Sequence, residues 1–242
     1  MSADFSNITI LGGGLLGGSL ALALARLKDA PGVRLWTRKP ETASAALGLG
    51  IPGATHDLGK AVEEADLLVL AVPVGSMATI VSQALEAGLP ERCVITDVGS
   101  VKQTPHLTIP PLLAGHNIQF IGSHPMAGSE RNGIASASAD LFRNAACLLT
   151  NDEQAATTST DALERFWKSV GCRTTWMNAA AHDELVARIS HLPHIIAASA
   201  ARVCLKQPAD GRFGGGGLRD TTRVASGNPD MWAEILTENR QA

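Results

Sequence analysis

The chain has 242 residues, and its 20 lysine and arginine residues against 23 aspartate and glutamate residues give a formal net charge of −3 at pH 7. This length suffices for one large or two modest domains with a substantial core. The slightly acidic balance argues against a general nucleic-acid-binding protein. No apolar run approaches the roughly 18 charge-free residues of a membrane span, and the first ten residues show neither the basic region nor the apolar core of a signal peptide. We therefore expect a globular cytoplasmic protein with no nucleic-acid partner and no membrane partner.

Two residue types limit the available chemistry. The four cysteines form no C-x-x-C pair and are typical of reduced core residues in a cytosolic protein; they are Cys93, Cys147, Cys172 and Cys204. The chain contains no tyrosine. Any proton transfer must therefore use a histidine, a carboxylate, a lysine or a hydroxyl.

Short apolar segments alternate with helix-forming segments over the first three quarters of the chain. The expected strands are residues 7–11, 33–36, 66–72, 93–96, 119–122, 146–150 and 173–176. The expected helices are residues 19–27, 41–47, 76–87 and 160–170. Because the strand segments are apolar throughout, we expect a parallel sheet that helices cover on both faces.

The pattern becomes helical after Asn178. Residues 179–205 are rich in alanine and predict one long helix. Asn178 is suited to be its N-cap, and Pro193 should kink it.

A glycine-rich segment, residues 211–217, follows the long helix, and we expect it to be a mobile loop. A last helix is predicted over residues 230–240. We therefore divide the chain into an α/β domain, residues 1–178, and an all-helical domain, residues 179–242.

A glycine-rich turn of the form G-x-G-x-x-G follows the first predicted strand. Gly12 permits a tight turn, Gly14 lets the backbone approach a pyrophosphate, and Gly17 allows close packing of helix on strand. The helix that follows, with Leu15 and Leu16 in its first turn, offers amides and a positive dipole to the phosphates. This context predicts a dinucleotide site in a Rossmann-type, doubly wound sheet. A glycine-rich turn of another βα fold is the alternative.

The residues after the second predicted strand indicate which dinucleotide binds. An NAD site usually has an acidic residue about 20 positions after the glycines, but Thr37, Arg38 and Lys39 occupy this place and the first carboxylate is Glu41. A hydroxyl and two cations suit a 2′-phosphate, because a guanidinium makes charge-assisted bonds to phosphate oxygens. We therefore predict NADP rather than NAD. In the alternative, Arg38 and Lys39 are solvated surface charges.

Three further segments follow apolar strands and should lie at the ligand-binding edge of the sheet. Val72 and Pro73 end the third predicted strand, and we expect them to contact the cofactor. A proline that merely ends a strand explains them nearly as well. The other two segments, residues 96–102 and 122–130, are unusually polar.

Five motifs in a fixed order carry a family resemblance: ILGGGLLGGSLALAL, TDVGSVK, GSHPMAGSE, SHLPH and RDTTRVA. With these motifs the chain resembles the prephenate/arogenate dehydrogenase family of tyrosine biosynthesis over essentially its whole length. The resemblance implies oxidative decarboxylation of prephenate to 4-hydroxyphenylpyruvate, or of arogenate to tyrosine. Hydride leaves the ring carbon that bears the hydroxyl for the nicotinamide, the ring carboxylate leaves as carbon dioxide, and the ring aromatises.

The resemblance gives His124, in GSHPMAG, the role of catalytic histidine. The residue type agrees, because imidazole is the side chain best suited to proton transfer near neutral pH; a structural histidine at a strand end is the alternative. Ser100, in DVGSVK, matches a serine that in the family hydrogen-bonds this histidine and the substrate hydroxyl. A helix N-cap before Val101 is a second role, compatible with the first.

The resemblance also places substrate-binding residues in the helical part. His194 matches a residue that contacts the substrate, and Ser190, four positions earlier on the same helix face, matches a weaker one. Arg223 matches an arginine that binds a substrate carboxylate, a task suited to a rigid guanidinium. Its alternative is an internal ion pair, for instance with Glu130 or Asp220. Glu130 is itself a candidate gate at the cleft mouth.

The histidines of the long helix do not predict a metal site. His191 and His194 lack the i, i+4 spacing and the acidic helper of a zinc-binding helix. His191 is expected to point away from the face that Ser190 and His194 share.

The chain ends at Ala242, where the family continues with further helices that build much of an interlocked dimer. We expect a shortened helical domain, a homodimer formed through it, and a small dicarboxylate substrate as the other partner. The early end fits either a short family member or a part of a longer chain.

Two other functions fit the sequence less well. A β-hydroxyacid dehydrogenase or imine-reductase-like enzyme typically needs a catalytic lysine or aspartate on the long helix, and residues 187–201 contain neither. A non-catalytic NADP-binding sensor predicts loss of the catalytic side chains, which this sequence retains. The sequence leaves the choice between prephenate and arogenate open.

Overall fold

The computed structural model describes residues 4–128 and 131–242 of the chain. Its first part contains a six-stranded parallel sheet in the order β3-β2-β1-β4-β5-β6. The strands are β1 (Asn7–Leu11), β2 (Gly32–Trp36), β3 (Ala54–Thr55), β4 (Leu67–Leu70), β5 (Val94–Asp97) and β6 (Gln119–Phe120). The helices between them are α1 (Leu15–Leu24), α2 (Pro40–Gly48), α3 (Leu58–Val62), α4 (Val74–Glu86) and α5 (Gln103–Thr108).

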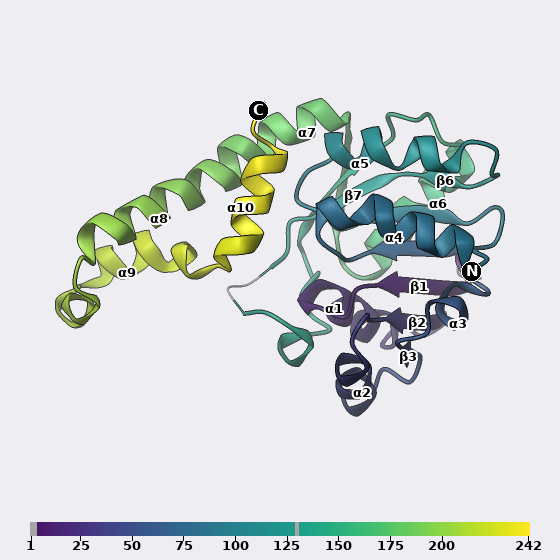
Figure 1. Ribbon diagram of the computed structural model, residues 1–242, viewed down its shortest axis with the longest axis horizontal. Helices are drawn as coiled ribbons and strands as arrows, with labels where there is room; N and C mark the ends of the chain where they lie inside the picture. The colour runs from purple at the N-terminus through teal and green to yellow at the C-terminus, as the bar shows by residue number, and fades with distance from the viewer. Residues whose placement is uncertain (1–3, 129–130) are drawn as a thin grey trace.

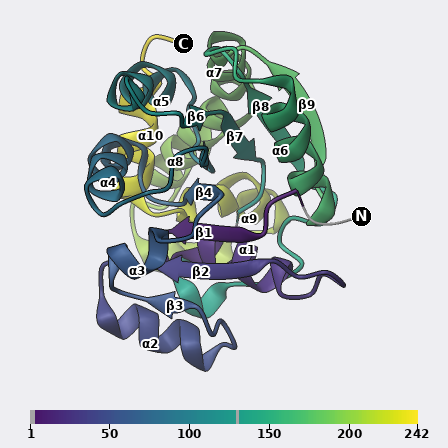
Figure 2. The same cartoon turned by 90° about the vertical axis from the view of Figure 1, so that its right-hand side faces the viewer.

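Both faces of this sheet are covered, which explains why its strands are apolar at successive positions. On one face, Ile10 and Val69 pack in a cluster with Leu20 and Leu24 of α1. On the other, alternate strand residues such as Leu70 pack in a second cluster with residues of α3 and α4. Figures 1 and 2 show the helices on the two sides of the sheet. The predicted Rossmann-type class is confirmed.

A second, three-stranded sheet departs from the expected single parallel sheet. It consists of β7 (Gly122–Pro125), β8 (Ala146–Thr150) and β9 (Arg173–Met177), with α6 (Thr157–Ser169) joining β8 to β9. β7 and β8 are antiparallel. The segment expected as one strand over 119–122 is divided between β6 and β7, because the chain leaves the first sheet after Phe120 and enters the second at Gly122.

The C-terminal part is helical, as expected, but its long helix is not uniform. It runs as α7 (Ala179–Val186), a π-helical turn (Ala187–His191) and α8 (Leu192–Cys204). Asn178 is the N-cap, its side chain accepting a hydrogen bond from the amide of Ala181 at 2.7 Å. Pro193 lacks an amide and clashes with the preceding turn in a regular helix, and the π-helical turn directly before it absorbs this irregularity.

The glycine-rich segment is more ordered than the mobile loop that we expected. A 3-10 turn (Pro208–Phe213) is followed by α9 (Gly216–Thr222) and a second 3-10 turn (Arg223–Ser226). The last helix is α10 (Pro229–Glu238), and Asn228 caps it. Glycines therefore do not prevent helix formation here, since α9 begins within the glycine run and continues through LRDTT.

α10 returns from the projecting helical arm to the α/β part (Figure 1). Glu234 accepts a hydrogen bond from the amide of Gly75 at the start of α4 at 2.9 Å. Glu238 accepts one from the hydroxyl of Thr104 on α5 at 2.8 Å. These contacts hold the arm against the sheet domain. Over residues 4–128 and 131–242, no helix has the length and apolar character that a membrane crossing requires.

Candidate functional site

The glycine turn between β1 and α1 has the geometry of a dinucleotide cradle. Gly12 has φ +123°, and a Cβ there would lie 2.2 Å from the carbonyl oxygen of Ala71. A Cβ on Gly17 would lie 1.9 Å from the carbonyl oxygen of Gly12, so helix and turn are in direct backbone contact. A Cβ on Gly14 would meet nothing within 4 Å, and no side chain caps α1 there. The open N-terminus of α1, with the amides of its first turn, therefore fits a pyrophosphate.

The residues after β2 lie next to this turn. The Thr37 methyl group would be 2.4 Å from a Cβ on Gly13, so Thr37 packs directly against the glycines. Its hydroxyl donates a hydrogen bond to the carbonyl oxygen of Lys39 at 2.7 Å, which makes Thr37 part of the local turn. Arg38 and Lys39 are exposed, and neither forms an ion pair within the described part of the chain. Two available cations thus lie at the carboxyl end of β2.

Val72 and Pro73 lie at the carboxyl end of β4, on the other side of the glycine turn. A side-chain carbon of Val72 would lie 3.2 Å from a Cβ on Gly12. Pro73 is the N-cap of α4. The two residues therefore border the cradle.

His124 lies at the centre of a buried polar cluster. It is on β7, 8% exposed. Its Nδ1 is 2.9 Å from Nε2 of His182 on α7, and Nδ1 of His182 is 2.8 Å from Oδ1 of Asp183. The amides of Lys102 and Gln103 donate to the two oxygens of Asp183 at 2.7 and 2.9 Å. The cluster therefore joins the α/β part to the helical part.

Burial and the groups around its ring keep His124 neutral. Burial lowers its pKa well below the usual value, and the nearby His182, Lys102 and His191 lower it further. Burial likewise lowers the pKa of His182, although Asp183 opposes this. Burial of Asp183 raises its pKa, but the hydrogen bonds from His182, Gln103 and Lys102 outweigh this effect and leave the pKa below its usual value. The cluster thus combines neutral imidazoles with an ionised carboxylate.

Ser100 lies in the loop between β5 and α5, and Asp97 shapes this loop. Asp97 accepts hydrogen bonds from the amides of Gly99 at 2.8 Å and Ser123 at 3.1 Å, and it forms a buried ion pair with Lys102. Ser100 is half-buried and makes no hydrogen bond within the described residues. It is not a helix N-cap, since α5 begins only at Gln103. Asp183 accepts the first amides of this helix instead.

His191 lies on the π-helical turn and His194 on α8, the segments that follow α7. His194 donates from Nδ1 to the carbonyl oxygen of Ser190 at 2.9 Å, and its ring stacks on Trp232 with 3.7 Å between centroids. The expectation that His191 points away from the face of Ser190 and His194 is wrong, because its ring contacts Trp232, the residue on which His194 stacks. His191 is 4% exposed, and its Nδ1 is 3.1 Å from the side-chain amide nitrogen of Asn239.

Arg223 is not brought into this cluster. It begins a 3-10 turn that packs against α8 on the projecting arm, and its side chain is exposed. Within the described residues it has no ion pair, so the alternative pairing with Asp220 is wrong. Glu130 lies outside the described residues, and its predicted gating role stays a prediction.

Sequence reasoning missed His182, Asp183 and Asn239. An adjacent histidine and aspartate in an alanine-rich helix was the available signal, but their partners are distant in sequence.

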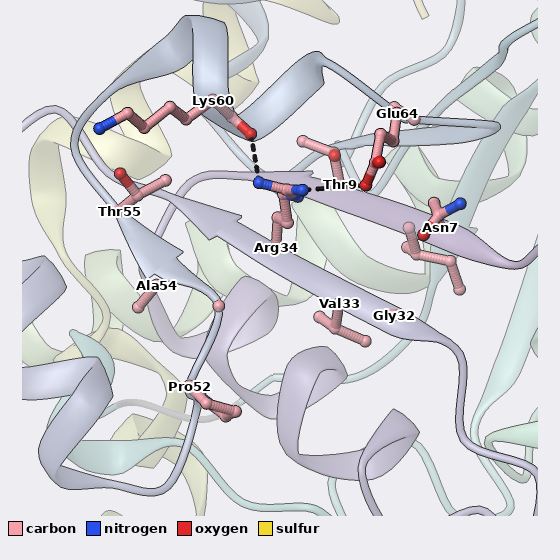
Figure 3. Close-up of a pocket in the computed structure, with 13 residues that line it drawn as sticks. Asn7, Thr9, Gly32, Val33, Arg34, Pro52, Ala54, Thr55, Lys60 and Glu64 are labelled. Atoms are coloured by element: carbon pink, nitrogen blue, oxygen red, sulfur yellow. Dashed lines mark hydrogen bonds and ion pairs between the residues drawn. The ribbon is translucent and has the colours of Figure 1, made fainter.

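A separate cavity of about 450 Å³ between α3 and strands β1–β3 shares no residue with the predicted site. Figure 3 shows that Arg34 there pairs with Glu64 and donates to the carbonyl oxygen of Lys60.

A parallel sheet with a glycine turn after its first strand, next to an uncapped helix N-terminus, defines a dinucleotide-binding fold. Residues 20–176 match the family model described as the nucleotide-binding domain of prephenate dehydrogenase. Residues 178–242 match its dimerization domain. The chain belongs to the prephenate dehydrogenase family.

Individual relatives agree with this assignment. The chain is 36% identical over 240 residues to prephenate dehydrogenase of Bacillus subtilis, covering 96% of this chain and 64% of that protein. It is 36% identical to cyclohexadienyl dehydrogenase of Zymomonas mobilis, covering 98% of this chain and 82% of that protein. The structure of Aquifex aeolicus prephenate dehydrogenase with hydroxyphenyl propionate and NAD+ is 30% identical, with a TM-score of 0.86, covering 98% of this chain and 83% of that one. The chain thus spans about two thirds of the length of the Bacillus protein.

Proposed function

We propose that this chain catalyses the oxidative decarboxylation of prephenate or arogenate, with NADP as the hydride acceptor. The observation that carries the proposal is the buried His124, which a lowered pKa keeps neutral, in a member of the prephenate dehydrogenase family. β7, which carries His124, belongs to the second sheet but packs beside β5, and the amide of Ser123 donates to Asp97 at the end of β5. These contacts support a place for His124 near the carboxyl end of the first sheet.

The reaction requires a group that takes the proton of the ring hydroxyl while hydride leaves the same carbon. The same group can return this proton to the phenolate oxygen after the ring carboxylate has left as carbon dioxide. A neutral His124 suits this exchange, because an imidazole accepts and releases a proton near neutral pH. When bound, the oxidised nicotinamide supplies the hydride acceptor. The half-buried Ser100 is the proposed second hydrogen-bond partner of the hydroxyl.

The two carboxylates of the substrate need cations or hydrogen-bond donors. Arg223 is the proposed carboxylate ligand, since its guanidinium is exposed and unpaired within the described chain. His194 and Ser190 are proposed contacts near the side chain of the substrate. Trp232 supports this role by holding the ring of His194 in a fixed plane.

The cofactor is proposed to lie along the glycine cradle, with its pyrophosphate at the N-terminus of α1. Arg38 and Lys39 favour NADP over NAD, because both are exposed cations with no acidic partner at the end of β2. Val72 and Pro73 are the proposed border of the nicotinamide half. We also propose residues 1–178 and 179–242 as the two domains, which the matched ranges 20–176 and 178–242 support.

A homodimer through the helical part is proposed as the working form. α8 and the turn before it expose apolar side chains at helical spacing, namely Ile189, Leu192, Ile196 and Val203, each at least 50% exposed. Such a stripe is typical of a helix that packs on another chain. The match to a dimerization domain supports this use. Sedimentation over a dilution series tests it.

The direct test is formation of reduced cofactor, followed by absorbance, with prephenate and arogenate each paired with NADP and with NAD. We expect turnover of at least one substrate, faster with NADP at low cofactor concentration. The His124→Asn variant serves as the background control. Turnover of a β-hydroxyacid, with neither cyclohexadienol oxidised, would overturn the proposal.

A further inference from the structure

Three buried side chains form a directed hydrogen-bond chain that ends on His124. Asp183 Oδ1, His182 Nδ1 and Nε2, and His124 Nδ1 are linked by contacts of 2.8 and 2.9 Å. His182 and Asp183 are 0% and 1% exposed. Neither residue belongs to the motifs that suggested the reaction, and their burial in a polar chain calls for a function.

The direction of each hydrogen bond follows from Asp183. Its carboxylate accepts from the amides of Lys102 and Gln103, so both oxygens act as acceptors. His182 must then donate from Nδ1, and a neutral His182 has its lone pair on Nε2. His124 must in turn donate from Nδ1 to that nitrogen. This leaves the lone pair of His124 on Nε2.

We propose that His182 and Asp183 are positioning residues that hold His124 in the tautomer whose Nε2 accepts the proton of the substrate hydroxyl. The inference rests on the proposed dehydrogenase reaction. An isolated imidazole has two neutral tautomers, and only one of them leaves Nε2 able to act as a base. The carboxylate at the far end also stabilises the imidazolium that forms when His124 accepts the proton, the role that an aspartate has behind a catalytic histidine.

A cation near His124 makes this support necessary. Lys102, although paired with Asp97, disfavours a positive charge at His124. Asp183 is the negative group that the hydrogen-bond chain connects to the ring. Because Asp183 is on α7 and also binds the start of α5, docking of the helical part and orientation of His124 depend on the same carboxylate.

The matched variants are His182→Gln and His182→Leu. A glutamine can accept from His124 through its carbonyl oxygen and donate to Asp183 through its amide, so it preserves the direction of the chain, whereas leucine of similar volume cannot. We expect the glutamine variant to keep kcat within about threefold of the wild type. We expect the leucine variant to lose about 10- to 100-fold in kcat with little change in KM. His56→Gln, at an exposed histidine, is the control substitution.

Nitrogen NMR of the ¹⁵N-labelled full chain reads the tautomer without any turnover. We expect Nδ1–H on His124 in the wild type and in the glutamine variant, and loss of this preference in the leucine variant. An Nε2–H tautomer in the wild type overturns the inference even where the leucine variant fails to fold. Equal losses in the glutamine and leucine variants, or a rise in KM alone, also overturn it. A wild-type chain that shows Nδ1–H on His124 but oxidises neither cyclohexadienol refutes the proposed function rather than the tautomer.

Discussion

The side-chain amide of Asn239 lies 3.1 Å from Nδ1 of His191, a residue 48 positions earlier in the chain. The same nitrogen donates to the carbonyl oxygen of Asp183 at 3.0 Å, which fixes the orientation of the amide. His191 Nδ1 must therefore accept, and burial lowers the pKa of His191 so that the ring is neutral. Its proton then lies on Nε2, a buried atom with no partner within the described residues. The end of α10 thus determines the state of a second histidine in the site.

Replacing Asn239 by alanine should destabilise the folded chain. The substitution removes both hydrogen bonds and leaves Nδ1 of His191 buried without a partner, whereas the carbonyl oxygen of Asp183 keeps its helical hydrogen bond from the amide of Ala187. We expect a loss of about 1–3 kcal/mol in the free energy of unfolding, measured by urea denaturation. Thr237→Ala, at an exposed position on the same helix, should change it by no more than about 0.5 kcal/mol. Equal effects of the two substitutions would contradict a stabilising role for the Asn239 hydrogen bonds.

Local signals in the sequence predicted much of the fold. β1 and β8 have the predicted bounds, α1 begins after the glycine turn, and Asn178 begins α7 as its predicted N-cap. These features depend on residues within a few positions of each other, so they are visible in the sequence. The change from β6 to β7 is not visible in the sequence. It depends on which sheet has a free edge rather than on the residues themselves.

The site was predicted less completely than the fold. Motifs identified His124 and the glycine cradle, but His182 joins His124 across 58 positions and Asn239 joins Asp183 across 56. No periodicity reports such tertiary pairs. His191 was misplaced because the expectation assumed a regular α-helix, whereas the π-helical turn rotates the residues before Pro193.

Arg38→Ala should weaken NADP binding much more than NAD binding. Loss of a charge-assisted contact to the 2′-phosphate is expected to cost about 1.5–3 kcal/mol, whereas NAD lacks this phosphate. Cofactor fluorescence titration measures both dissociation constants. Arg26→Ala, which removes an exposed arginine paired with Asp140, is the matched control. Tighter binding of NAD than NADP by the wild type would reject the predicted preference.

His124→Asn should leave cofactor binding intact and reduce turnover at least about 100-fold, the usual contribution of a positioned acid–base group. Asparagine retains a polar side chain of similar reach but cannot take up the proton. Steady-state kinetics gives kcat, and fluorescence titration checks that the cradle still binds the dinucleotide. Turnover within a few fold of the wild type would assign the role to another residue.

The folded chain should lose stability as the pH falls below about 6.5. Unfolded histidines take up protons near this pH, whereas burial lowers the pKa of His124, His182 and His191 in the folded state. Between the lowered pKa values and 6.5 the unfolded state binds more protons, so the free energy of unfolding rises with pH in that window and is constant above it. Urea midpoints from pH 5 to 8 measure this. His124→Asn should flatten the slope, because it removes one of the histidines whose pKa burial lowers.

Arg223→Ala should raise KM strongly and change kcat less, because a carboxylate ligand acts in the ground state and in the transition state alike. Leaving a substrate charge unpaired in a partly desolvated site is expected to cost about 2–4 kcal/mol in kcat/KM. Arg223→Lys should recover only part of this loss, since an ammonium lacks the fork that binds both carboxylate oxygens. Arg219→Ala, at an exposed arginine on α9, controls for the removal of positive charge from the same arm. Kinetics of the Arg223→Ala variant equal to those of the wild type would remove the carboxylate assignment, and Ser190 and His194 would then have to bind the dianion alone.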